Sequence, residues 1–133
     1  MWYLKYITVV TSCLIIGSSC KSTITQRQET YQSVMSKIKF DRTKLDNNGL
    51  IGPEDGKRSL DYEYCIPNTP KHKSEVQRID LNVKFLEESK GRINCKQGTI
   101  LCISNTHQRH YYDVLELLAK LKYVYEIREV FYE

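Results

Sequence analysis

The chain has 133 residues, enough for one domain with additional segments. It carries 20 Lys and Arg against 16 Asp and Glu, and the excess lies early, because residues 21–45 hold six basic and two acidic side chains. Residues 60–133 hold eleven of each sign. A domain without a net positive field is poorly suited to nucleic acid, so the charge pattern argues against that class of partner.

The N-terminus has the layout of a signal peptide. Residues 1–6 carry one charged side chain, residues 7–16 are apolar or small, and residues 17–19 are small and precede Cys20. The apolar stretch is shorter than the ~20 residues that a transmembrane helix needs. We therefore expect residues 1–19 to be a signal peptide that is removed on entry into the secretory pathway.

The stretch IGSSC at residues 16–20 resembles the lipobox of bacterial lipoproteins. Gly17 departs from that pattern, in which Leu or another bulky apolar residue is usual. The resemblance covers only the N-terminal stretch and implies that Cys20 is lipidated, with two or three acyl chains that would anchor it stably in a lipid bilayer. Lys21 stands where inner-membrane lipoproteins of Gram-negative bacteria carry Asp, so the resemblance implies the periplasmic side of the outer membrane.

Residues 20–59 are interpreted as a polar, basic tether followed by a loop. Apolar side chains between Tyr31 and Ile38 stand at helical spacing, which is compatible with a short amphipathic helix. Turn-forming residues crowd positions 46–58 and predict a loop. The basic residues suit anionic headgroups beside a lipid anchor, and a solvated spacer is an equal interpretation. They are Lys21, Arg27, Lys37, Lys39, Arg42 and Lys44.

The folded domain is expected at residues 60–133. Residues 60–66 alternate between apolar and polar side chains, which predicts a strand. A helix is expected at residues 70–80, with Thr69 as its cap and proline in its first turn. Residues 81–87 alternate again and favour a second strand, although a helix that continues through them competes with this reading.

The second half of the domain repeats this order. Residues 99–104 are strongly apolar and predict a central strand. Asn105 or Thr106 is expected to cap the following helix. Residues 124–132 predict a final strand. The helix between them has a buried stripe at helical spacing, made of Tyr111, Val114, Leu115, Leu118 and Leu121.

The resulting order is strand, helix, strand, strand, helix, strand. This is the split βαβ arrangement of the ferredoxin-like fold, in the α+β class. Right-handed crossovers would place both helices on one face of a four-stranded antiparallel sheet and leave the other face open. The fold hosts unrelated functions, so it does not indicate an activity.

Three cysteines follow Cys20. In the expected topology Cys65 ends the first strand, and Cys95 lies in a loop that returns to the same end of the sheet. We predict that these two form a disulfide, which would contribute about 3 kcal/mol by the chain-entropy estimate. A bond between Cys95 and Cys102 across a hairpin, or no bond, remains open. The C-x-x-C spacing of redox enzymes is absent, which argues against catalytic thiols.

His107 and His110 lie three residues apart at the expected start of the last helix, so they can share a face. With a third ligand they would form a weak zinc or copper site, whereas the commoner role of such residues is a solvated helix end. Arg109 between them would attract a phosphate or carboxylate at the helix N-terminus.

The sequence contains neither a G-x-S-x-G elbow nor a Gly-rich phosphate loop. We therefore expect a non-catalytic protein without a cofactor. Tyrosine is frequent, with ten residues, and Tyr125 and Tyr132 on the expected open sheet face are candidates for a partner surface. The alternative is that the tyrosines complete a small core.

The function expected from the sequence is therefore that of a membrane-anchored envelope lipoprotein whose small domain binds another envelope protein or a cell-envelope component. The alternative is metal or redox handling by His107, His110 and the cysteines.

Overall fold

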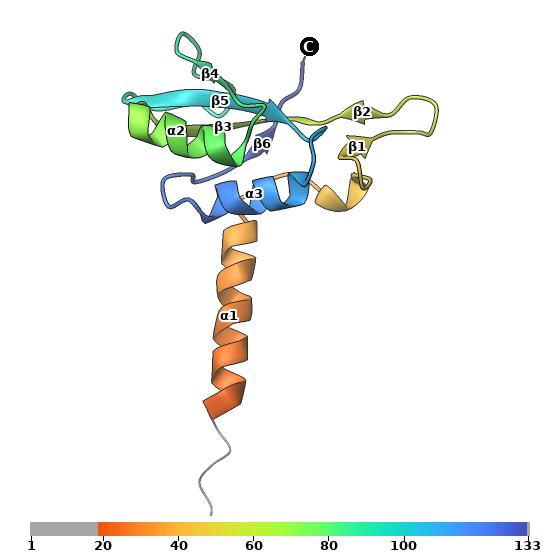
Figure 1. Ribbon diagram of the computed structural model, residues 1–133, viewed down its shortest axis with the longest axis vertical. Coiled ribbons are helices and arrows are strands. Elements are labelled where there is room, and N and C mark those ends of the chain that lie inside the picture. Colours follow the sequence, from red (N-terminus) through yellow and green to blue (C-terminus); the bar gives the residue numbers. More distant parts are fainter. Residues whose placement is uncertain (1–18, 133) are drawn as a thin grey trace, which may run out of the picture.

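The computed structural model describes the backbone of residues 19–132 and the side chains of residues 24–132. The expected signal peptide therefore lies outside the described residues except for Ser19. None of the helices in the described part of the chain is long and apolar enough to span a membrane. The elements in chain order (Figure 1) are α1 (Ser19–Met35), the 3-10 helix η1 (Arg42–Lys44), β1 (Leu50–Ile51), β2 (Arg58–Ser59), β3 (Asp61–Pro67), α2 (Pro70–Ile79), β4 (Lys84–Leu86), β5 (Thr99–Asn105), α3 (Tyr111–Lys120) and β6 (Arg128–Glu129).

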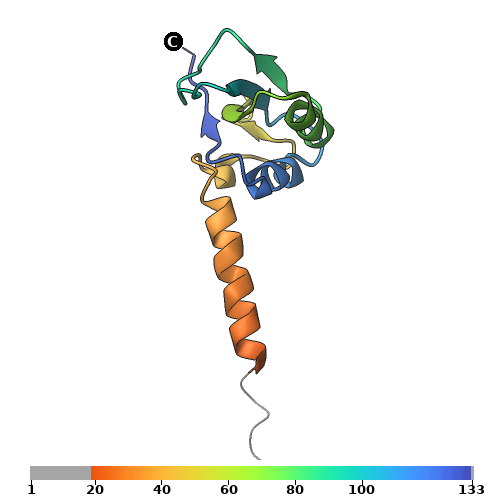
Figure 2. The ribbon, with the colours of Figure 1, turned by 90° about the vertical axis from the view of Figure 1, so that its left-hand side faces the viewer.

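The centre of the domain is an antiparallel sheet of four strands in the order β4-β5-β3-β6. The ladder between β3 and β5 is the longest and runs from the pair Asp61 and Asn105 to the pair Pro67 and Thr99. Helices α2 and α3 lie on the same side of this sheet (Figures 1 and 2). The expected α+β class and four-stranded antiparallel sheet are confirmed.

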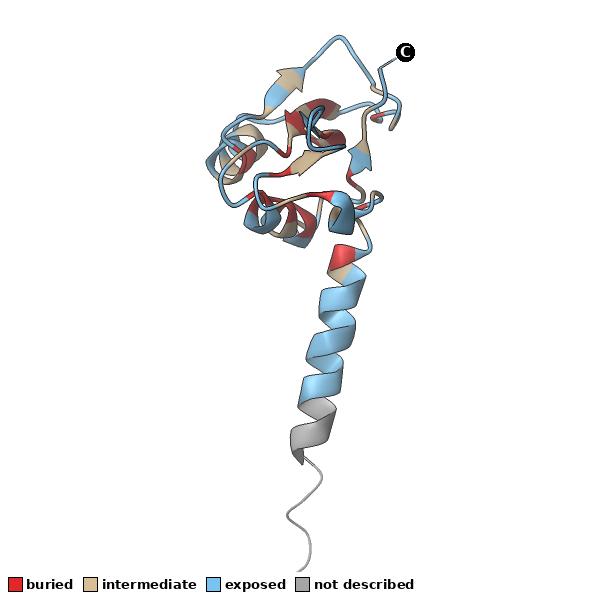
Figure 3. Ribbon diagram, turned by 90° about the vertical axis from the view of Figure 1, so that its right-hand side faces the viewer, coloured by how far each residue is buried: buried red, intermediate tan, exposed pale blue. Residues whose placement is uncertain are grey.

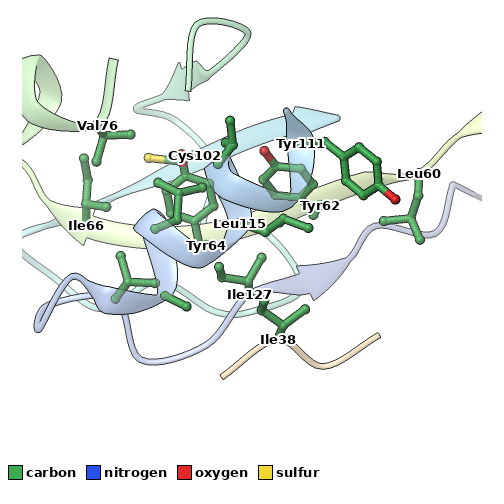
Figure 4. Packing of buried hydrophobic residues seen from close by; sticks show 14 of the residues in the cluster. Ile38, Leu60, Tyr62, Tyr64, Ile66, Val76, Cys102, Tyr111, Leu115 and Ile127 are labelled. Carbon is green, nitrogen blue, oxygen red and sulfur yellow. The ribbon is translucent and has the colours of Figure 1, made fainter. Parts of the chain in front are cut away.

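Alternation along β3 builds the core because successive side chains of a strand point to opposite faces. Tyr62, Tyr64 and Ile66 are fully buried beneath the helices. Leu115 of α3 and Val76 of α2 pack on them (Figure 4). The apolar residues that alternate along residues 60–66 therefore mark the face of β3 that the helices cover.

The first helix of the domain begins as predicted. The side chain of Thr69 caps α2 by accepting a hydrogen bond from the backbone N–H of His72, and Pro70 occupies the first turn. The helix ends at Ile79, so the competing longer helix is wrong. The strand expected at residues 81–87 is confirmed in part, since β4 covers Lys84–Leu86.

The buried stripe of α3 is confirmed for Tyr111, Val114, Leu115 and Leu118. Its predicted cap is wrong. The residue before the helix is His110, whose φ of 55° is left-handed and whose side chain makes no capping hydrogen bond. Thr106 has another role, since its buried hydroxyl donates to the carbonyl of Gly49 and accepts from the N–H of Leu60. The chain therefore makes a turn between Thr106 and the helix.

The folded part starts well before Leu60. Met35, Ile38 and Leu45 belong to the buried core. Ile38 forms a parallel bridge with Ile127, flanked by backbone hydrogen bonds of 2.8 Å in each direction. Much of the expected tether and loop therefore packs into the domain, and β1 and β2 form a two-stranded sheet within the expected loop and at its end.

The last strand is shorter than expected. The strand expected at residues 124–132 is reduced to β6, which pairs only Glu129 with Tyr62 and Arg128 with Glu63. Ile127 is fully buried, and its N–H and C=O bond to Lys37 and Lys39 on the side that faces away from β3. Residues 37–39 therefore lie along the outer edge of the chain that leads into β6.

Helix α1 projects from the domain as a rod (Figures 1 and 3). All side chains from Ile24 to Ser33 are exposed, and only Val34 and Met35 at its end are covered. Among its described side chains, the helix is therefore covered by the domain only in its last turn. Its 17 residues span about 25 Å at 1.5 Å per residue.

Candidate functional site

The predicted disulfide between Cys65 and Cys95 is present, with the Cα atoms 5.6 Å apart. It joins the end of β3 to the loop between β4 and β5. Cys102 is a free, buried thiol, as expected for a cysteine inside an apolar strand. Burial raises the pKa of the Cys102 thiol to about 12, so it stays protonated at neutral pH. With two cysteines bonded and the third enclosed, the folded domain presents no thiolate to solvent.

The loop at residues 87–98 covers part of the sheet face that lies opposite the helices. Its backbone N–H at Ile93 donates to the Glu63 carboxylate over 2.7 Å, and Glu63 and Leu101 are buried. Gly91 has a φ of +62°, and a Cβ there would lie 2.6 Å from a Glu63 carboxylate oxygen. The expectation of an open sheet face is therefore wrong along the middle of β3 and β5.

Tyr125 lies beside this loop and is 82% exposed. It borders a hollow of about 280 Å³, which we call the disulfide hollow. The walls come from β3, from the covering loop and from the chain after α3. The residues that line it are Cys65, Ile93, Asn94, Cys95, Lys96, Thr99, Tyr123, Tyr125 and Glu126.

Tyr132 lies elsewhere. It is 72% exposed, and its hydroxyl donates to the carboxylate of Asp61 over 2.9 Å. This hydrogen bond is the main cause that raises the pKa of the Tyr132 hydroxyl. Asp61 begins β3 and Cys65 lies four residues further along it, about 13 Å away. The structure therefore does not bring Tyr125 and Tyr132 into one compact patch.

A second hollow of about 700 Å³ adjoins the first, and we call it the phenylalanine hollow. It is lined by residues that include Phe40 and Phe131, the latter 58% exposed. Glu126 lines both hollows and pairs with Arg128 at 3.0 Å. The two hollows thus border one stretch of chain, residues 123–131, which Tyr132 follows directly. Phe40 was not among the expected site residues, because it belongs to the segment that the sequence predicts as a tether.

The histidines do not gather into a site. His107 precedes α3 and its Nδ1 lies 3.4 Å from the carbonyl of Asn48, while His110 is 3.9 Å from Asp113. Both are exposed, as is Arg109. Among the described side chains, no three His, Cys, Asp or Glu residues lie close enough to hold a metal ion.

The structure also contains a buried polar cluster that was not predicted from the sequence. The fully buried Asp80 at the end of α2 accepts hydrogen bonds from Tyr62 at 2.7 Å, Ser104 at 2.8 Å and Gln108 at 3.2 Å. Burial, and then the nearby carboxylate, raises the pKa of Tyr62 well above its usual range. Because Asp80 is enclosed, the cluster can join α2 to the sheet but cannot meet a solute. The one sign of this cluster in the sequence is an Asp directly after a predicted helix. Such an Asp is also common at helix ends that face solvent, so it does not distinguish the two cases.

No protein family, no curated protein and no solved structure was found that matches this chain. The candidate site therefore rests on its geometry: two adjoining hollows, a disulfide that fixes one wall, and aromatic side chains that are exposed along the C-terminal segment.

Proposed function

We propose that this protein is a lipid-anchored domain of the bacterial envelope that binds another envelope protein, without a catalytic role. The binding surface would be the C-terminal segment at residues 123–132 together with the two hollows that it borders. The proposal joins the lipobox resemblance at Cys20 to the exposed aromatic side chains at the other end of the molecule.

The exposed aromatic residues carry the proposal. Tyr125, Phe131 and Tyr132 are 82%, 58% and 72% exposed. Large aromatic side chains are costly to leave in water and are enriched where proteins meet. In both side views the C-terminus lies at the end of the domain that is farthest from the start of α1 (Figures 1 and 2). This end would face away from a membrane that holds Cys20.

Helix α1 supports the anchoring part of the proposal. Its backbone begins at Ser19, so Cys20 stands in its first turn. A chain cut before Cys20 would then carry its lipid at the tip of a rod of about 25 Å, with the domain at the other tip. Between the two, exposed and mostly polar side chains suit an aqueous spacer.

We also propose that the domain is a ferredoxin-like split βαβ fold. Two units support this proposal: β3 with α2 and β4, and β5 with α3 and β6. In the sheet order β4-β5-β3-β6, strand β5 lies between the two strands of the first unit, and β3 lies between the two strands of the second. Both helices are on one side of the sheet, as that fold requires.

Capture of partners from detergent-solubilised bacterial membranes tests the binding role. A tagged full chain should retain specific envelope proteins, and the double variant Tyr125→Ser with Tyr132→Ser should retain them at least several-fold less. Tyr112→Ser on α3 is a matched control, because Tyr112 is 46% exposed and lies outside both hollows. Capture that is equal for the double variant and the wild type would reject the proposed surface.

The anchor is tested by the intact mass of the protein purified from bacterial membranes. A mass that begins at Cys20 and includes two or three acyl chains would support the lipoprotein assignment. A full-length mass without lipid would reject it.

A further inference from the structure

The edge of β3 is left without a neighbour along half of its length. On the β6 side, the ladder pairs Tyr62 with Glu129 and Glu63 with Arg128, and it stops there. Strand β3 continues to Pro67 and is paired over this whole length only on its β5 side. From Tyr64 to Pro67 the sheet therefore has an open edge on one side.

The direction of the backbone groups along β3 follows from the neighbouring hydrogen bonds. The carbonyl of Leu60 accepts from Thr106 on the β5 side, and the carbonyl of Asp61 accepts from Val130 on the β6 side. Because the direction alternates, the N–H and C=O of Cys65 also point to the β6 side. On that side, Cys65 has no strand partner among the described residues. The open edge thus offers one donor and one acceptor at the same residue.

The disulfide hollow lies at this same place. Cys65 forms one of its walls, while Tyr123, Tyr125 and Glu126 form another. The chain after α3 therefore separates from β3 where the ladder ends, and the hollow separates the two. Two independent features, a free strand edge and a cavity, coincide at Cys65.

The walls of the hollow are held in place. The disulfide fixes Cys65 to Cys95. Across the hollow, the hydroxyl of Tyr123 donates to Glu75 over 2.7 Å, and its ring meets that of His72 edge-on at 4.6 Å. A site that is already shaped loses less entropy when it binds, so even a short ligand can be retained.

We propose that the disulfide hollow takes a short extended segment of a partner polypeptide, one residue of which pairs with the backbone of Cys65. This inference rests on the proposed binding function and names the class of ligand for it. The segment continues the row of the sheet that β6 begins, by β-strand addition. The exposed ring of Tyr125 lies beside it and provides apolar contact.

The geometry also restricts the side chain of the pairing residue. Residues that oppose each other in a ladder point to the same face, so this side chain lies on the disulfide side of the sheet. Ile93 and the disulfide line the hollow there, whereas the charged residues Lys96 and Glu126 also belong to its lining. An uncharged apolar residue at the pairing position, with polar neighbours in the segment, fits this lining.

The test uses the isotope-labelled full chain in detergent micelles and the capped peptide Ac-Thr-Val-Thr-Val-Thr-NH₂ as probe. In the free protein, the amide of Cys65 should exchange with solvent faster than those of Tyr64 and Ile66, which point to β5. Addition of the peptide should shift the Cys65 amide resonance and slow its exchange. The same peptide with both valine nitrogens methylated should have no such effect, because it lacks those N–H groups.

A variant distinguishes binding of the peptide in the disulfide hollow from non-specific binding. Tyr125→Ala should weaken the peptide about tenfold, which corresponds to about 1.4 kcal/mol. Tyr112→Ala is the control and should bind as the wild type does. Slow exchange of Cys65 in the free protein, or equal binding of the methylated peptide, would overturn the inference. So would shifts at Cys65 with an N-acetylglucosamine oligomer and none with the peptide, which would make the hollow a glycan site.

The outcomes distinguish this inference from the proposed function. Loss of membrane-partner capture in the Tyr125 variant without any peptide effect at Cys65 would reject strand addition and retain the binding surface. A peptide effect at Cys65 together with unchanged capture by the Tyr125 and Tyr132 double variant would reject the proposed function for that surface.

Discussion

Removal of the disulfide is the perturbation whose size follows most directly from the structure. The bond between Cys65 and Cys95 closes a loop with a sequence separation of 30 residues. The chain-entropy relation gives about 3.5 kcal/mol at 25 °C for a loop of this length. A domain of this size has a free energy of unfolding of about 5 to 15 kcal/mol, so the bond contributes a large part of it.

The double variant Cys65→Ala with Cys95→Ala should therefore lose about 3 to 4 kcal/mol of unfolding free energy in urea titrations followed by circular dichroism. Cys102→Ala is the matched control, because it deletes a buried sulfur without opening a cross-link. The control should lose only about 1 kcal/mol, the cost of a small cavity.

A second measurement locates the effect. The loop at residues 87–98 is attached to the sheet by the disulfide and by the hydrogen bond from Ile93 to Glu63. Without the disulfide, the Ile93 amide should exchange with solvent faster, while the amides of β5 keep most of their protection. If the double variant lost no more stability than Cys102→Ala, the chain-entropy reasoning would be refuted for this loop.

Three further predictions concern the buried groups. Asp80→Ala leaves the hydroxyls of Tyr62 and Ser104 buried without their acceptor, so it should cost about 2 to 6 kcal/mol in the same titrations, whereas Asp80→Asn keeps an acceptor oxygen and should cost less. Equal losses for the two variants would argue against the hydrogen bonds as the cause. The enclosed Cys102 thiol, whose pKa is raised to about 12, should resist iodoacetamide at pH 8 until the protein is unfolded, as counted by mass spectrometry; rapid labelling of the native protein would contradict its burial. Burial also raises the pKa values of Tyr62 and Tyr64, so the folded state keeps protons that the unfolded chain releases above about pH 10, and stability should fall there by about 1.4 kcal/mol per pH unit for each group; urea midpoints that stay constant from pH 9 to pH 11 would refute this.

The elements with strong local periodicity could be predicted from the sequence. The apolar alternation of β3, the cap of α2 at Thr69 and the stripe of α3 each depend on residues that are close in the chain. The disulfide was predictable because the order of strands brings Cys65 and Cys95 to one end of the sheet.

The remaining features depend on contacts between distant residues. Nothing local in Ile38 shows that it bridges Ile127, so the early start of the core could not be predicted from the sequence. His110 ends a turn that is shaped by the contacts of Thr106 with Gly49 and Leu60. The pattern of polar and apolar residues indicates which face of a helix or strand is buried. It does not indicate which distant segment covers that face.

The candidate site also depends on how distant segments of the chain are placed. The exposure of Tyr125 and Tyr132 agrees with a surface role, but they are seven residues apart in the chain, and a full-length last strand would also hold them far apart. The disulfide hollow lies where the chain after α3 no longer pairs with β3, beside Cys65. Sequence reasoning finds the aromatic residues, and the tertiary structure determines the cavity beside them.

The rod formed by α1 has a consequence for how an anchored domain would search for a partner. A flexible tether of 15 residues has a root-mean-square reach of about 21 Å, similar to the length of the helix, yet it lets the domain visit every height down to the bilayer. A helix instead holds the domain at one distance from the lipidated residue, and its last turn is joined to the core at Met35. The domain would then move over a shell about 25 Å from its own anchor, and its effective concentration would be high for partner sites on that shell and close to zero for sites immediately beside the anchor.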